Sequence, residues 1–254
     1  MYKRLLRENN ASTDKIKIVV LGTYFNIKRL LEDLNSRDQM NLLIENVDEI
    51  VMGAPITKNA NTISSGSSIS MARESTIYVL KNTPESIELT VMGTHMYSKF
   101  RRNVDLKIDS DYISEIKDGP VKTAYAYYNQ YGKLSIYDQA MILYSIIGED
   151  GYLNKRRNLS LDINAPGFLE TYKITDSSLY DGEEYYWNTS DPGRKYSKLD
   201  FAGNVKYNNY REKIELLMSQ EPILPPIKHH STTCWFPLFL DDIITLLPCH
   251  ASNK

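Results

Sequence analysis

The sequence predicts an α/β fold in which a mostly parallel sheet is flanked by helices. Three aliphatic runs, at residues 16–22, 47–53 and 87–93, each end on a glycine and indicate buried strands. Helical patterns lie between consecutive runs. Because parallel strands are joined by right-handed crossovers, the three strands are expected to lie close together in one sheet.

The connections between these strands differ in character. After the first strand, apolar residues between 27 and 34 recur at intervals of three and four, which is typical of one face of a helix. Residues 54–70 are rich in Ser, Thr, Asn and Gly and are predicted to form a loop. A further helix is expected from near Met71 to beyond Leu80.

The second half of the chain is predicted to be mixed. Helices are expected at residues 109–116 and 122–130, and a strongly apolar helix with an acidic first turn at 135–147. Residues 158–209 contain strand and turn signals, including Asp-Gly and Asp-Pro-Gly. An amphipathic helix is expected at 210–220.

The pattern changes after Pro222. Proline and histidine pairs interrupt any period, so we divide the chain into an α/β domain at 1–221 and a C-terminal extension at 222–254. The apolar tract from Cys234 to Cys249 contains two prolines and two aspartates, which argues against a membrane span.

Charge and cysteine content exclude several classes of partner. The formal net charge is −2 and the pI is near 6.1, so nucleic acid is not an expected partner. The run Lys155-Arg156-Arg157 lacks interleaved aromatic residues and is interpreted as a solvated face. Two cysteines and the absence of a signal peptide favour an intracellular location.

The glycines at the three strand ends are one candidate for a site. In open parallel sheets, ligands bind outside the carboxyl ends of the strands, and glycine allows close approach of the backbone. The alternative is that Gly22, Gly53 and Gly93 serve only as turns.

Four motifs, in order along residues 15–220, resemble the inosine–uridine nucleoside hydrolases. Residues 18–27 are similar to the family's aliphatic strand followed by Gly-Pro-Leu-Thr-Asn-Ile. Residues 50–53 are similar to its strand ending in Met-Gly-Gly, and Asn61 follows where the family often has Gly-Asn. Residues 137–140 are similar to its His-Asp-Pro-Leu-Ala at the head of a helix.

The resemblance implies a calcium-dependent N-glycosidase, in which a metal held by aspartates binds the sugar diol and activates water. By that analogy, Asp138 and the carbonyl of Leu21 match metal ligands. Met52 and Asn61 match residues that line the ribose site. If Asp138 is not a ligand, it serves to offset the positive end of its helix.

The departures from the family predict loss of activity. The chain begins after the point where the family carries its aspartate-rich motif, so the fold is expected to be truncated at the N-terminus. Residues 66–68 replace the family's Glu-Phe-Asn, and Tyr137 replaces a histidine acid. One carboxylate and one carbonyl are too few for calcium.

Three hypotheses remain open from the sequence, and one of them is an unrelated doubly wound domain, since fold alone does not fix function. The first is a catalytically inactive relative, a pseudoenzyme without a cofactor, kept as a binding or structural subunit of a complex. The alternative is an active nucleoside N-ribohydrolase whose missing aspartates come from another chain or from a missing N-terminal segment. A missing first strand would also leave a sheet edge unpaired, so a partner protein, a homo-oligomer contact or residues 222–254 are expected to cover it.

Overall fold

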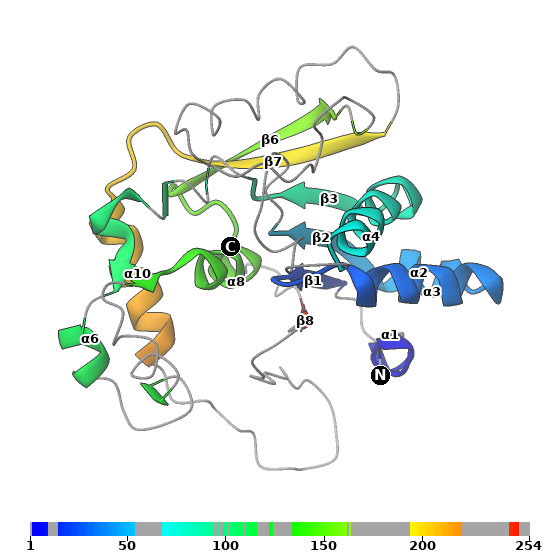
Figure 1. The fold of residues 1–254 in the computed structure, drawn as a ribbon, viewed down its shortest axis with the longest axis horizontal. Coiled ribbons are helices and arrows are strands. Elements are labelled where there is room, and N and C mark those ends of the chain that lie inside the picture. Colours follow the sequence, from blue (N-terminus) through cyan, green and yellow to red (C-terminus); the bar gives the residue numbers. More distant parts are fainter. Residues whose placement is uncertain are drawn as a thin grey trace, which may run out of the picture.

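The computed structural model describes residues 2–9, 15–53, 68–93, 96, 99–100, 102–108, 110–115, 122–123, 134–161, 163 and 194–219, and the backbone of 244–248. A mostly parallel mixed sheet lies at its centre, which confirms the α/β class (Figure 1). Five strands follow the order β6-β7-β3-β2-β1, and β8 extends the sheet beyond β1. The strands are β1 (Ile16–Val20), β2 (Val47–Met52), β3 (Glu88–Val91), β6 (Leu153–Ser160), β7 (Lys195–Phe201) and β8 (Ile244–Pro248).

The three strands expected from the sequence are adjacent and parallel. Ile18 of β1 pairs with Ile50 of β2, and Ile50 pairs with Leu89 of β3. On the far side of β3, β7 is also parallel, with Val91 opposite Lys198. The outer strands β6 and β8 run antiparallel to their neighbours. Because these three strands are parallel, their carboxyl ends lie next to one another at the same end of the sheet.

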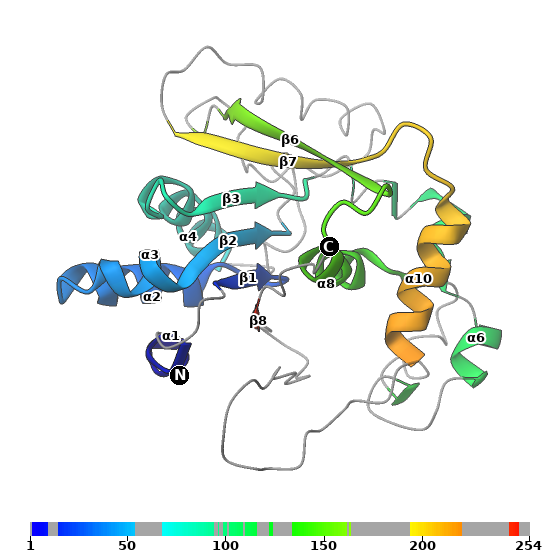
Figure 2. The same ribbon diagram turned by 180° about the vertical axis from the view of Figure 1, so that it is seen from behind.

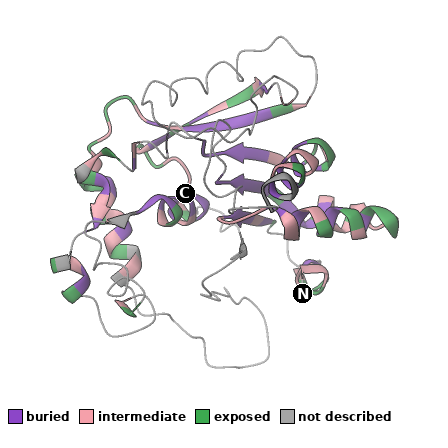
Figure 3. Ribbon diagram, viewed as in Figure 1, coloured by how far each residue is buried: buried purple, intermediate pink, exposed green. Residues whose placement is uncertain are grey.

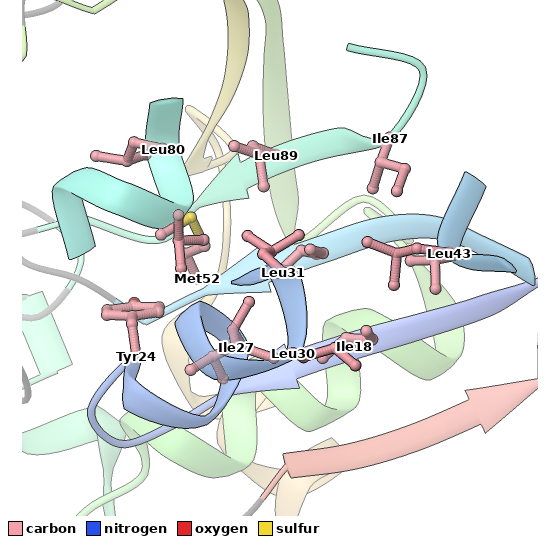
Figure 4. Packing of buried hydrophobic residues seen from close by; sticks show 14 of the residues in the cluster. Ile18, Tyr24, Ile27, Leu30, Leu31, Leu43, Met52, Leu80, Ile87 and Leu89 are labelled. Atoms are coloured by element: carbon pink, nitrogen blue, oxygen red, sulfur yellow. The ribbon is translucent and has the colours of Figure 1, made fainter. Parts of the chain in front are cut away.

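Four helices belong to one side of the sheet, namely α1 (Tyr2–Asn9), α2 (Phe25–Ser36), α3 (Met40–Asn46) and α4 (Ser68–Asn82). Their apolar side chains pack with alternate residues of the strands, including Ile18 and Met52 (Figure 4). Burial is concentrated in the central strands, and the outward side of α2 remains exposed (Figure 3).

The other side of the sheet packs against α8 (Tyr137–Ile147) and α10 (Tyr207–Ser219). Val19 and Val51, which alternate with the residues of the first cluster, belong to this second cluster. Seen from either direction, α8 and α10 lie at the arrowhead ends of the central strands and α2 to α4 at the other ends (Figures 1 and 2). Shorter elements complete this side: η1 (Val104–Leu106), α6 (Ser110–Glu115), β4 (Lys107–Ile108) and β5 (Leu134–Ser135).

Several boundaries differ from the sequence-based expectation. The helix predicted from Met71 begins at Ser68, and the one predicted from Ser135 begins at Tyr137 because Leu134–Ser135 pairs with β4. The last predicted helix begins at Tyr207 rather than Tyr210. The expected helix at 122–130 and the turns at 181–182 and 191–193 lie almost entirely outside the described residues.

The β1 edge of the sheet is paired within the chain. Ile244–Pro248, from the C-terminal extension, runs antiparallel to β1 with Val20 opposite Ile244. The sequence analysis expected residues 222–254 as one of the segments that could pair with an exposed edge strand. Among the helices that the structure describes, none combines the length and apolar character needed to cross a bilayer.

Candidate functional site

The carboxyl ends of β1 and β2 approach α8 very closely. The Gly53 amide donates to the Val20 carbonyl at 3.1 Å, which joins the two strand ends. A Cβ added to Gly53 would lie 2.5 Å from the Met141 sulfur and 3.3 Å from the Val20 carbonyl oxygen. Any larger residue at this strand end would therefore require Met141 of α8 to move, as expected for a close approach of backbone to a neighbouring element.

The first residue of α8 is fixed to the end of β3. The Tyr137 hydroxyl donates a hydrogen bond to the Met92 carbonyl, and the Met92 amide donates to the Met52 carbonyl at 2.9 Å. The Tyr137 ring packs edge-on against Phe100 with centroids 5.7 Å apart. Tyr137 is therefore a buried residue whose hydroxyl proton is already donated to a carbonyl oxygen at the end of β3.

Asp138 follows Tyr137 in the first turn of α8. Its side chain is exposed, yet the surrounding protein removes enough hydration to raise its pKa from 3.8 to about 6. No cation, hydrogen bond or second carboxylate contributes to that shift. The N-cap position is Ile136, and α8 has no side-chain capping hydrogen bond. Within the described chain, Asp138 is a single unpaired acid.

The structure places the other predicted site residues differently. Leu21 directly follows β1, is half-buried and packs against the same cluster as α8. The Met52 side chain is fully buried among residues of α2 and α4, on the opposite side of the sheet from α8 (Figure 4). Asn61 lies outside the described residues.

These positions do not make a calcium site from the described residues. Calcium takes about six to eight oxygen ligands, several of them carboxylates. The carbonyls of Val20, Met52 and Met92 each already accept a hydrogen bond within the protein. Across the described parts of the chain, no three His, Cys, Asp or Glu side chains converge as a metal ion would need. Asp138 and the Leu21 carbonyl alone do not fit the ion.

Tyr24 is a buried polar group that the sequence analysis did not single out. It precedes α2 at the carboxyl end of β1 and lies beside Met52 (Figure 4). Its side chain is fully buried, and its hydroxyl has no hydrogen-bond partner among the residues that the structure describes. Burial raises the pKa of this hydroxyl well above its ordinary value, so it stays protonated.

A second polar cluster lies nearer the amino ends of the strands, between the sheet and α8. Its centre is Glu49 of β2, a carboxylate with 2% of its side chain exposed. Lys155 of β6 donates to it at 2.7 Å, and Lys17 of β1 lies 3.2 Å from its second oxygen. Tyr144 of α8 donates to it at 2.8 Å and Thr90 of β3 also donates to it.

The charges in this cluster are balanced by direct contacts. Lys155 also reaches Glu88 at 2.5 Å, and Ser197 donates to Glu88 at 2.5 Å. Burial alone would raise the pKa of Glu49, but the charge of Lys155 and its hydrogen bond outweigh that cost and lower it. Glu49 is therefore ionised, and its oxygens are occupied by cations and hydrogen-bond donors of the protein. This is the arrangement of a structural ion pair rather than of an acid free to act on a substrate.

The position of Lys155 corrects an expectation from the sequence. The run Lys155-Arg156-Arg157 was interpreted as a solvated face, but the Lys155 side chain is buried in the Glu49 cluster. Alternation along β6 separates Lys155 from Arg156, because successive side chains of a strand point to opposite faces, and the regular pairing with β7 is lost after Arg156. Arg157 does remain exposed, where it pairs with Glu149 at 3.2 Å.

No protein-family model matches this chain, and no curated protein matches it. The likeness to nucleoside hydrolases therefore depends on the four motifs described above.

Proposed function

We propose that this chain is a nucleoside-hydrolase-like protein without hydrolase activity of its own, and that it acts as a binding or structural subunit. The observation that carries the proposal is the isolation of Asp138. In a calcium-dependent hydrolase, several acids share one ion, and each raises the pKa of the others until the ion arrives. The pKa of Asp138 is raised by desolvation alone, without a contribution from a neighbouring acid.

The described residues near Asp138 suit a small neutral ligand better than a divalent cation. Asp138 supplies two acceptor oxygens, and Tyr137 and Met141 hold the helix that carries it in place. A sugar hydroxyl can donate to such a carboxylate without any metal. The site would then bind a hydroxylated ligand, but it would lack the ion that lowers the pKa of water for attack on a glycosidic bond.

Calorimetric titration of the full chain with calcium chloride, followed by ribose, tests this function. We expect no saturable calcium binding and no release of reducing sugar from inosine or uridine. We expect any ribose binding to be unchanged by a chelator and weakened by Asp138→Asn. Glu45→Gln, at an exposed position of α3, is the matched control for loss of one carboxylate.

An active, calcium-requiring nucleosidase is the competing outcome. It would bring its missing aspartates from another chain or from a preceding segment. Calcium-dependent sugar release by the purified chain, abolished by Asp138→Asn, would overturn the proposal. Activity that appears only after a second protein is added would support the completed-site alternative.

A further inference from the structure

Two cations lie directly opposite each other on neighbouring strands of the sheet. Lys198 of β7 pairs with Arg156 of β6, so their side chains belong to the same face. Like charges in directly opposed positions of a sheet repel and destabilise it. A negative group beside the two side chains would offset that repulsion.

Asp200 supplies one negative charge on this face, two residues beyond Lys198 along β7. Its Oδ1 lies 3.9 Å from Lys198 Nζ, and its Oδ2 lies 4.0 Å from Nη1 of Arg156. Both distances exceed the length of a charge-assisted hydrogen bond, about 2.7–2.9 Å. Oδ1 is buried and accepts no hydrogen bond from the described residues. We call these three side chains the Lys198 cluster.

The Lys198 cluster lies at the carboxyl end of the parallel part of the sheet. Lys198 pairs with Val91, the last residue of β3. Tyr196, which shares the face of Lys198, donates to the Leu80 carbonyl at 3.2 Å, so this face is the one covered by α4. Helix α8, which carries Asp138, packs on the other side. The cluster therefore has the location at which open parallel sheets bind ligands, but it is separate from the Asp138 site.

The two cations of the cluster differ in exposure. Lys198 has 1% of its side chain exposed, whereas Arg156 has 38%. The field of a buried charge is screened by salt much less than that of an exposed one. An anion arriving from solvent therefore meets Arg156 first, with the charge of Lys198 behind it. The pairing of β6 becomes irregular directly after Arg156, and bulges of this kind are frequent next to active sites.

We propose that the Lys198 cluster binds a phosphate group, with Arg156 as the residue that contacts it and Lys198 as a buried charge that strengthens the attraction. A guanidinium group donates in a planar fork that matches two phosphate oxygens. A phosphate monoester carries about −1.5 to −2 charges at pH 7. It would thus convert the repulsion between the two cations into a shared attraction, while the charge of Asp200 limits the affinity.

Calorimetric titration of the full chain at constant ionic strength tests the site, with inorganic phosphate and glycerol 3-phosphate as probes. We expect saturable binding of at least one probe, and the tighter of the two identifies whether the phosphate is a free ion or part of an organic molecule. Arg156→Gln should weaken this binding about tenfold or more, because it removes a hydrogen bond between charged groups.

Three further variants separate this site from other effects of charge. Arg157→Gln removes the same charge from the next residue, which is exposed and pairs with Glu149, and it should leave the affinity unchanged. Asp200→Asn should strengthen binding, because it removes a charge that repels the anion. Asp138→Asn should have no effect on phosphate binding, so failure of the function proposed for Asp138 would be distinguishable from failure of this site.

Three results would count against phosphate binding by the cluster. The first is the absence of saturable binding of either probe to a native chain that unfolds cooperatively in urea. The second is an equal loss of affinity in Arg156→Gln and Arg157→Gln, which would indicate attraction to the general charge of β6. The third is weaker binding by a folded Asp200→Asn chain, which would show that Asp200 holds the cations in place and does not oppose the anion.

Discussion

Lys155 and Glu49 lie 106 residues apart in the chain, yet their side chains meet at 2.7 Å in the buried layer between the sheet and α8. This contact joins β6, near one end of the sheet, to β2 at its centre. Replacing either residue with an apolar one, while its partner stays buried, is expected to lower the stability of the fold.

Replacing Lys155 alone should destabilise the fold strongly. Lys155→Met keeps an unbranched side chain of nearly the same length but leaves Glu49 buried with Lys17 as its remaining cation among the described residues. Breaking a buried pair by removing one partner costs about 3–5 kcal/mol, and we expect a loss near the lower end of that range. Urea denaturation at pH 7 measures it.

Arg157→Met is the matched control on the same strand. Its ion pair with Glu149 is exposed, and such pairs contribute about 0–1 kcal/mol. Equal effects of the two substitutions would contradict the buried role of Lys155.

Asp138 should make the protein less stable as the pH rises through its folded pKa. That pKa is raised from 3.8 to about 6, so the folded state binds the proton more tightly than the unfolded chain does. The stabilising effect is fully present below pH 3.8 and is lost as the pH rises through about 6. Asp138→Asn should therefore be more stable than the native chain at pH 7, and this gain should disappear near pH 3.5.

Thermal melts of both chains across this pH range check the sign. A variant that is less stable at pH 7 would instead support the alternative from the sequence, in which the negative charge of Asp138 offsets the positive end of the helix.

Tyr24→Phe should stabilise the protein. No described residue offers this buried hydroxyl a hydrogen-bond partner, and leaving such a group unsatisfied costs about 1–3 kcal/mol. Tyr144→Phe removes a hydroxyl that donates to Glu49 at 2.8 Å, and hydrogen bonds to charged groups contribute about 1.5–3 kcal/mol. The two identical chemical changes should thus shift the urea midpoint in opposite directions, and a shift in the same direction would refute this account of Tyr24.

Gly53→Ala should destabilise the junction of β2 with α8. The new methyl group would lie 2.5 Å from the Met141 sulfur, so Met141 must move. Overpacking of this kind costs about 1–3 kcal/mol. Met141→Val should recover part of the loss in the double variant, and purely additive effects in the double-mutant cycle would show that the two residues are not coupled.

The core of the fold could be predicted because its signals are local. The runs at 16–22, 47–53 and 87–93 are mostly aliphatic, and they do form the three adjacent parallel strands. The helix at Tyr137–Ile147 was likewise recognisable from its continuous apolar sequence. Two short helices, α1 and α3, were not predicted, because α1 is strongly charged and α3 is only seven residues long.

The polar chemistry could be predicted less well because it depends on partners far apart in the sequence. A charged residue such as Glu49 in an apolar strand indicates that some cation must meet it, but not which one. The identity of Lys155 as that cation depends on the position of β6 in the sheet. Similarly, only the resemblance to nucleoside hydrolases suggested that Met52 lines a ribose site, and the alternation along β2 directs its side chain into the α4 side of the core.

Helix α8 is held at both ends, by Tyr137 at the carboxyl ends of the strands and by Tyr144 in the Glu49 cluster. These two tyrosines are two turns apart, a distance of about 10 Å along the axis. A molecule that docks at the first turn therefore meets a platform already rigid before its arrival. Recognition there would proceed as a lock-and-key event, without the entropic penalty that accompanies ordering of a loose segment.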